Sequence, residues 1–78
     1  MKTYKTILAK VLGINEGSIS DSTSPLTVKT WDSFNGLMIV SELESAYNVS
    51  FTIDEVVSVK CVLDIKNCLK KHGVQIDE

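Results

Sequence analysis

Small and apolar residues recur at helical spacing in two stretches of the chain. The first stretch lies over residues 3–12 and is followed by Gly13, a residue that commonly ends a helix. Its apolar members, three and four positions apart, are Tyr4, Ile7, Leu8, Val11 and Leu12. The second stretch begins near residue 32. An α-helix turns about 100° per residue, and this rotation brings the small and apolar residues of the stretch onto one stripe along the helix. That stripe consists of Gly36, Ile39, Val40, Leu43 and Tyr47, with Leu37 at its margin. We expect both stripes to face the core.

The outer face of the second predicted helix combines polar and apolar residues. Its members are Asn35, Met38, Glu42 and Ser45, with Phe34 on the same outer side. Phe34 and Met38, four residues apart, therefore form an apolar pair away from the core and beside Ser33. Single exposed apolar residues are common on protein surfaces, whereas a pair at a helix start is consistent with a binding surface.

The segment "TIDEVVSVKCVLDIKNCLKKHG" is rich in valine, which favours a strand, but it also contains signals for helices. Thr52 followed three residues later by Glu55 forms a capping box, which starts a helix. Ser58 is a candidate for a second cap, and Gly73 is a stop signal. Beyond Ser58, one apolar face is formed by Val62, Ile65 and Leu69, flanked by Cys61 and Cys68. We predict a short helix near 53–57 and a longer helix near 59–71.

Between the first two predicted helices lies a long stretch rich in Ser, Thr and Gly, with the only proline of the chain. Its four apolar residues, which we expect to pack against the core and keep it ordered, are Ile14, Ile19, Leu26 and Val28. The elements together predict an all-α fold in one domain, residues 1–78. We expect a small antiparallel four-helix bundle with a long ordered loop between helices one and two and a short third helix.

The chain has 78 residues, of which 44% are hydrophobic and 23% charged, as is typical of a single soluble domain. It begins with no charged-then-apolar leader and contains no apolar run long enough to cross a bilayer. We therefore expect a cytoplasmic monomer without membrane insertion. In that compartment, Cys61 and Cys68 are expected to be reduced thiols in the core rather than a disulfide.

Charge is unevenly distributed along the chain, although its net value is only −2. All eight basic residues are lysines, and none lies between residues 30 and 59. That interval holds five acidic residues: Asp32, Glu42, Glu44, Asp54 and Glu55. They form either a solvated acidic face or a surface for a basic partner. Nucleic acid is disfavoured as that partner, because no basic stripe accompanies the specialised part of the chain.

The sequence lacks the residue sets of common catalytic and metal sites. It has one histidine, His72, in a lysine-rich helix end, and two cysteines without a third ligand. It also has no glycine-rich phosphate loop, and we expect no enzyme activity. What remains is a hydroxyl at a helix start, where Asp32 or Ser33 is a natural N-cap. Free N–H groups and the helix dipole also make such a start an anion site, so a phosphate esterified to Ser33 would be well placed there.

The segments "WDSF" and "LMIVSELESAYNVSFTIDE" resemble the acyl carrier protein (phosphopantetheine-binding) family, whose hallmark is Asp-Ser-Leu at the start of the second helix. The likeness covers almost the whole chain and includes "VLGI" and "SVKCVLDI". It implies that Ser33 carries covalent 4′-phosphopantetheine, whose thiol holds an acyl group as a thioester, and that Asp32 is the preceding acid. The docking positions that it implies are Asp32, Phe34, Leu37, Met38, Glu42 and Glu44. The implied partners are a phosphopantetheinyl transferase and acyl-activating, acyltransferase or synthase enzymes with basic and apolar docking patches.

The chain departs from the pattern of carriers in ordinary fatty-acid synthesis. Phe34 replaces the usual leucine, and Asn35 and Met38 stand where those carriers have acids. The departures indicate a specialised lipid, fatty-acid or secondary-metabolite pathway, with Phe34 and Met38 supplying apolar docking contacts. Trp31 is expected to pack under the long loop. The alternatives are an aminoacyl or peptidyl carrier and an unmodified helical interaction module in which Ser33 is only a cap.

Overall fold

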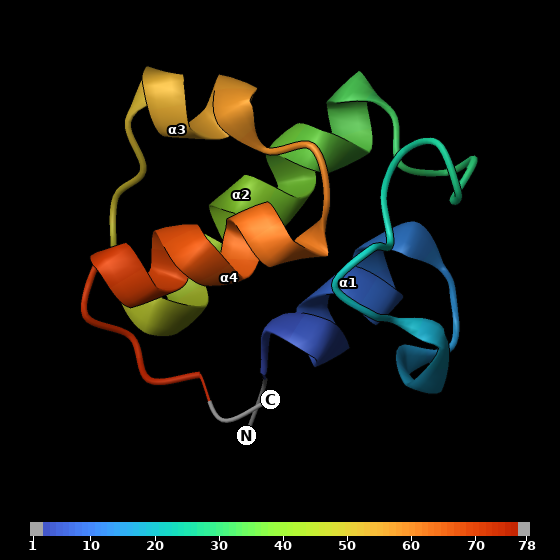
Figure 1. The fold of residues 1–78 in the computed structure, drawn as a ribbon, viewed down its shortest axis with the longest axis horizontal. Coiled ribbons are helices and arrows are strands. Elements are labelled where there is room, and N and C mark those ends of the chain that lie inside the picture. The colour runs from blue at the N-terminus through green and yellow to red at the C-terminus, as the bar shows by residue number, and fades with distance from the viewer. Residues whose placement is uncertain (1–2, 77–78) are drawn as a thin grey trace.

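The computed structural model describes residues 3–76, which contain four α-helices, one short 3₁₀ helix and no strand (Figure 1). The elements in chain order are α1 (Tyr4–Leu12), η1 (Glu16–Ser18), α2 (Ser33–Tyr47), α3 (Ile53–Ser58) and α4 (Val62–Lys71). This confirms the all-α class, the long connection between the first two helices and the short third helix. Figure 1 shows α3 at the edge of the fold, above α2 and α4 in that view.

Local signals account for most helix ends. The side chain of Thr3 accepts a hydrogen bond from Thr6 N at the start of α1, and Gly13 ends that helix in the left-handed conformation, at φ +67°. At the start of α3, Thr52 and Glu55 form the predicted capping box. At the end of α2, Asn48 takes the left-handed conformation at φ +55°. Both ends of α1 and the start of α3 lie within about one residue of their predicted places.

The predicted start of α4 near residue 59 is wrong, because the helix begins at Val62. Ser58 does not cap it: the Ser58 hydroxyl donates to the Asp54 carbonyl at 2.6 Å. Instead, Val62 N donates to Thr23 O at 2.9 Å and Leu63 N donates to Asp21 O at 3.0 Å. Two of the free N–H groups of the first turn are thus satisfied by the long loop, and Val59 and Cys61, between α3 and α4, have extended backbone.

The core is built from the predicted stripes. The buried apolar residues are Tyr4, Ile7, Leu8, Leu12, Ile19, Trp31, Ile39, Leu43, Val62, Ile65 and Leu69. Three members of the stripe on α2, Gly36, Val40 and Tyr47, are only half-buried. Val40 is incompletely covered because it faces a cavity, described below.

The long loop is ordered partly by apolar and partly by polar contacts. Ile19 is buried and Ile14 and Val28 are half-buried, as predicted, but Leu26 is 97% exposed, so its predicted packing is wrong. An ion pair also ties the loop to α4, because buried Lys66 on α4 reaches the exposed Asp21 in the loop at 2.9 Å. Buried Thr23 contributes another link, since its hydroxyl accepts a hydrogen bond from Ser20 N at 2.9 Å.

Candidate functional site

The start of α2 separates the capping residue from the candidate attachment residue. Asp32 is the N-cap: its Oδ1 accepts a hydrogen bond from Asn35 N at 2.9 Å. The Asn35 side-chain amide in turn donates to Thr30 O at 2.7 Å and ties the helix start to the preceding loop. Ser33 is the first helical residue, is exposed, and its hydroxyl forms no hydrogen bond with any part of the chain that the structure describes. The Ser33 hydroxyl is therefore available for reaction without loss of a cap.

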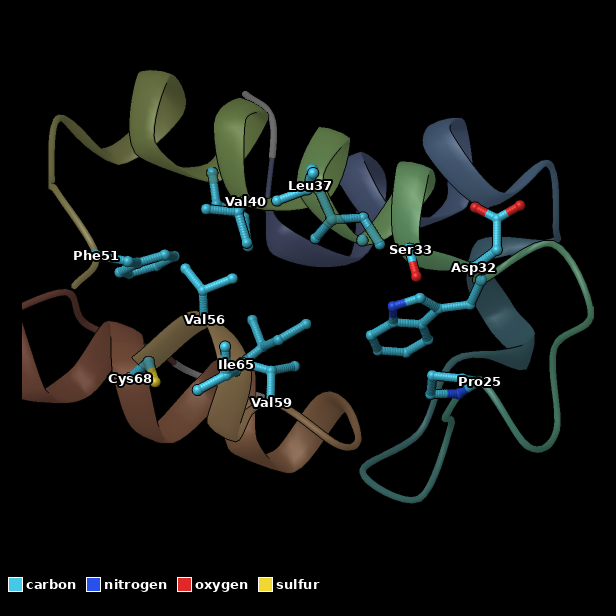
Figure 2. A pocket seen from close by; sticks show the side chains of 15 residues that line it. Pro25, Asp32, Ser33, Leu37, Val40, Phe51, Val56, Val59, Ile65 and Cys68 are labelled. Carbon is cyan, nitrogen blue, oxygen red and sulfur yellow. The ribbon is translucent and has the colours of Figure 1, made fainter. Parts of the chain in front are cut away.

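Ser33 lies at the edge of an apolar cavity of about 550 Å³ between α2 and the pair α3 and α4 (Figure 2). In Figure 2 the Ser33 hydroxyl points to the cavity side of α2, whereas the Asp32 carboxylate points away from the cavity. A volume of this size falls within the range of about 300–1,000 Å³ that is usual for small-molecule sites. An attached group could thus pass from Ser33 directly into an apolar space.

One face of α2 forms the first wall of the cavity. Ser33, Leu37 and Val40 lie at positions i, i+4 and i+7 and therefore share a side of the helix, with Gly36 between them. Figure 2 shows Leu37 and Val40 extending toward the side chains of the opposite wall. Because Gly36 has no side chain, the passage from Ser33 along this face stays open.

The second wall comes from α3, the segment after it, and α4. Its residues are Val56, Val57, Val59, Ile65 and Cys68, with Phe51 at the start of the connection. This wall was not predicted from the sequence. The sequence does contain a pattern that could have predicted it. The segment from residue 53 to residue 59 holds more apolar residues than one core-facing stripe requires, which indicates a second apolar surface. Ile53 and Val57 remain 81% and 68% exposed, so the excess is visible on the surface of α3.

Trp31 lines the cavity at the end next to Ser33 and is, with Phe51, one of its two aromatic residues. It is 6% exposed, in agreement with the expectation of packing, but the prediction that it only packs under the loop missed its position beside Ser33. A Cβ atom placed on Gly36 would lie 3.7 Å from Trp31 Nε1. The indole nitrogen is therefore close to the α2 backbone, one turn beyond Ser33.

The two cysteines are free thiols, but the prediction that both lie in the core is wrong, since each is only half-buried. Cys68 lines the cavity from α4. Burial raises the pKa of the Cys68 thiol, and the nearby Glu55 charge raises it further. Cys68 is therefore protonated at neutral pH and acts as a weakly polar part of the wall.

The outward pair Phe34 and Met38 lies where the sequence predicts it, and Leu37, which was expected at the margin of the core-facing stripe, is exposed beside it. Phe34 is 70% exposed, Leu37 62% and Met38 42%. Together they form an apolar surface along the first two turns of α2, and we call these three residues the α2 apolar patch. Exposed apolar residues that cluster at the start of a helix are a candidate surface for binding another protein.

The acidic residues near this surface differ in how far their carboxylates are free to contact a partner. Asp32 is exposed, and Glu42 lies 3.9 Å from Lys10 of α1. Glu44 is half-buried and accepts a hydrogen bond from Phe51 N at 2.8 Å. Glu55 is buried, so the acidic face that it was grouped with is smaller than the sequence suggests.

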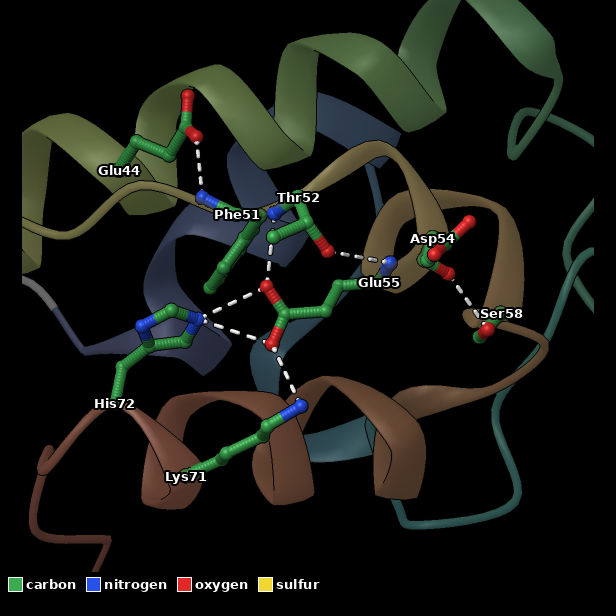
Figure 3. Close-up of polar contacts among 8 residues, drawn as sticks. All are labelled: Glu44, Phe51, Thr52, Asp54, Glu55, Ser58, Lys71 and His72. Atoms are coloured by element: carbon green, nitrogen blue, oxygen red, sulfur yellow. Dashed lines mark hydrogen bonds and ion pairs between the residues drawn. The ribbon is translucent and has the colours of Figure 1, made fainter.

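Glu55 instead joins α3 to the end of α4 (Figure 3). Its carboxylate accepts a hydrogen bond from Thr52 N at 2.8 Å and two from His72 Nε2 at 3.0 Å, and it lies 3.5 Å from Lys71 Nζ. The hydrogen bond from the Thr52 backbone, followed by the His72 hydrogen bond, lowers the pKa of Glu55 to about 2. The His72 ring also lies 5.4 Å from the Phe51 ring, centroid to centroid. These contacts hold α3 over the cavity.

Residues 3–76 contain neither a metal-binding cluster nor a membrane-spanning helix. No three His, Cys, Asp or Glu side chains in that range come together in a way that could hold a metal ion. No helix there is both long and apolar enough to cross a bilayer. No protein-family model matches the chain, and no curated protein matches it significantly.

Proposed function

We propose that this chain is an acyl carrier protein in which Ser33 bears 4′-phosphopantetheine. The observation that carries the proposal is the free, exposed Ser33 hydroxyl at a helix N-terminus and at the edge of an apolar cavity. The acyl carrier protein family, which the sequence resembles, has an antiparallel four-helix bundle. We propose the same arrangement for this chain. The thiol of the arm would hold acyl groups as thioesters for separate enzymes.

The start of α2 suits a phosphodiester. A phosphopantetheinyl transferase would join Ser33 Oγ to the phosphorus of coenzyme A that bears the pantetheine, with release of adenosine 3′,5′-bisphosphate and a proton. The first-turn N–H groups and the positive end of the helix dipole favour the negative charge that stays on the chain. Because Asp32 supplies the cap, this reaction leaves the helix start intact.

The cavity suits an acyl group. Its walls are formed mainly by valine, leucine, isoleucine and aromatic side chains, so an alkyl chain placed there would lose contact with water. Burial of that kind contributes about 0.8 kcal/mol per CH₂ group and keeps water from a thioester. The cavity therefore supports a fatty acyl or related apolar cargo.

The α2 apolar patch and its acidic neighbours would form the surface for partner enzymes. Exposed ion pairs contribute about 0–1 kcal/mol each, whereas one desolvated apolar contact at the centre of an interface can contribute about 2 kcal/mol or more. With Asn35 and Met38 in place of acids, the surface relies on Phe34, Leu37 and Met38. We propose partners with matching apolar and basic patches in a specialised lipid, fatty-acid or secondary-metabolite pathway, acting on a monomeric carrier in the cytoplasm.

Incubation with a broad-specificity phosphopantetheinyl transferase and coenzyme A, followed by intact-mass measurement, tests the proposal. The wild type should gain the mass of one phosphopantetheine and Ser33→Ala should gain none. Ser41→Ala and Ser45→Ala are matched controls, because both serines are exposed on the same helix, and both variants should be modified. A wild type left unmodified by several transferases, or a modified Ser33→Ala, would favour an unmodified interaction module or another site.

A further inference from the structure

The indole N–H of Trp31 is a hydrogen-bond donor without a partner in residues 3–76, on a side chain that is 6% exposed. A buried tryptophan N–H normally finds an acceptor. No fully buried side-chain nitrogen or oxygen in the described residues lacks a partner, so Nε1 is not sealed in the core. Since the Trp31 side chain lines the cavity, its donor opens onto the cavity and awaits an acceptor there.

The position of this donor relates it to Ser33. Nε1 lies 3.7 Å from the place of a Gly36 Cβ. Gly36 follows Ser33 by three residues, which puts the two on the same side of α2, about 4.5 Å apart along the helix axis. Anything attached to Ser33 that enters the cavity along α2 must pass this donor.

The other polar groups near the entrance do not compete for this role. The Asp32 carboxylate accepts the capping hydrogen bond and points away from the cavity (Figure 2). The Cys68 thiol lies on the wall formed by α4 and is a weak donor. Trp31 is therefore the strong side-chain donor at the start of the path into the cavity.

We infer that Trp31 Nε1–H donates a hydrogen bond to a hydroxyl or carbonyl oxygen of the arm next to its phosphate. Trp31 is then a positioning residue that directs the arm along Gly36, so that the thioester and its acyl chain reach the apolar interior. This inference rests on the proposed carrier function and adds the residue that orients the arm.

Trp31 is the only tryptophan of the chain, so a ¹⁵N-labelled sample gives a single indole N–H signal. Intact mass first establishes conversion of the apo protein to the form that carries the arm. The indole proton should then shift downfield, and its exchange with solvent should slow about fivefold, the change expected for one added hydrogen bond. Acylation of the arm should leave the signal where it is. Ile53→Ala is a matched control, because Ile53 is an exposed apolar residue outside both the cavity lining and the α2 apolar patch, and it should respond like the wild type.

Trp31→Phe removes the donor and keeps an aromatic ring. In that variant, NMR relaxation of an isotope-labelled arm should show a more mobile proximal segment than in the wild type, at unchanged helix content. Modified protein with an unmoved indole signal would overturn this inference and leave the carrier proposal standing. A shift that appears only after acylation would assign the donor to the cargo and overturn it as well. Absence of any modification would refute the carrier proposal and this inference together.

Discussion

Replacement of Gly36 by alanine tests the packing at the entrance to the cavity. Glycine inside a helix costs about 0.5–1 kcal/mol relative to alanine, because the unfolded chain loses more freedom on folding. The φ angle of Gly36 is not positive, so alanine fits its backbone without strain. The new Cβ would meet Trp31 Nε1 at 3.7 Å, an ordinary van der Waals distance. The variant should therefore gain about 0.5–1 kcal/mol of unfolding free energy.

For a domain of this length, that gain corresponds to a melting temperature about 2–8 °C higher, measurable by circular dichroism and urea unfolding. Gly13→Ala is the control, because there we expect the free energy of unfolding to fall rather than rise. Gly13 ends α1 at φ +67° with open space around it, so alanine there should cost about 1 kcal/mol through backbone strain alone. A destabilised Gly36→Ala would show that the Trp31 ring presses on the helix and that the entrance is closed.

Three further predictions concern the N-cap of α2, the stability of the protein at low pH and the docking of partner enzymes. Ser33→Ala should leave the free energy of unfolding within about 0.5 kcal/mol of the wild type, whereas Asp32→Ala should lose about 1 kcal/mol; equal losses in urea unfolding would contradict the cap assignment. Because the pKa of Glu55 is lowered from 4.5 to about 2, its stabilising contribution is complete above 4.5 and is lost as the pH falls toward 2. Melting temperatures of Glu55→Gln should therefore fall less steeply over that range than those of the wild type, and parallel curves would refute the assignment. Phe34→Ala should weaken binding to the dedicated enzyme at least tenfold, and Met38→Glu should weaken it while making the remaining affinity more sensitive to salt; an unchanged Phe34→Ala complex that added salt dissociates would show that docking is electrostatic.

The sequence predicts those parts of the fold that depend on neighbouring residues. The start of α3 follows from Thr52 and Glu55, three residues apart, and the end of α1 follows from Gly13. The buried faces follow from helical spacing, because one helix buries one stripe wherever its partner lies. The exposure of Phe34 and Met38 follows from the same geometry.

The parts that the sequence does not predict depend on contacts between distant segments. The late start of α4 requires the Thr23 and Asp21 carbonyls of the loop, about forty residues away in the chain. The exposure of Leu26 depends on how that loop is held, which no local pattern expresses. The cavity is space that side chains of three helices leave unfilled, so it becomes visible only when the helices are placed together. The use of Glu55 inside the fold likewise depends on His72 from the end of α4.

The central claim, that Ser33 carries an acyl thioester on a phosphopantetheine arm, is tested most directly on the chain purified from the cells that make it. Intact-mass measurement followed by fragmentation gives the mass of any added group and the residue that bears it. The account predicts one phosphopantetheine on Ser33, with an acyl group that hydroxylamine removes at neutral pH. Protein of unmodified mass, or an added group located on another residue, would contradict it.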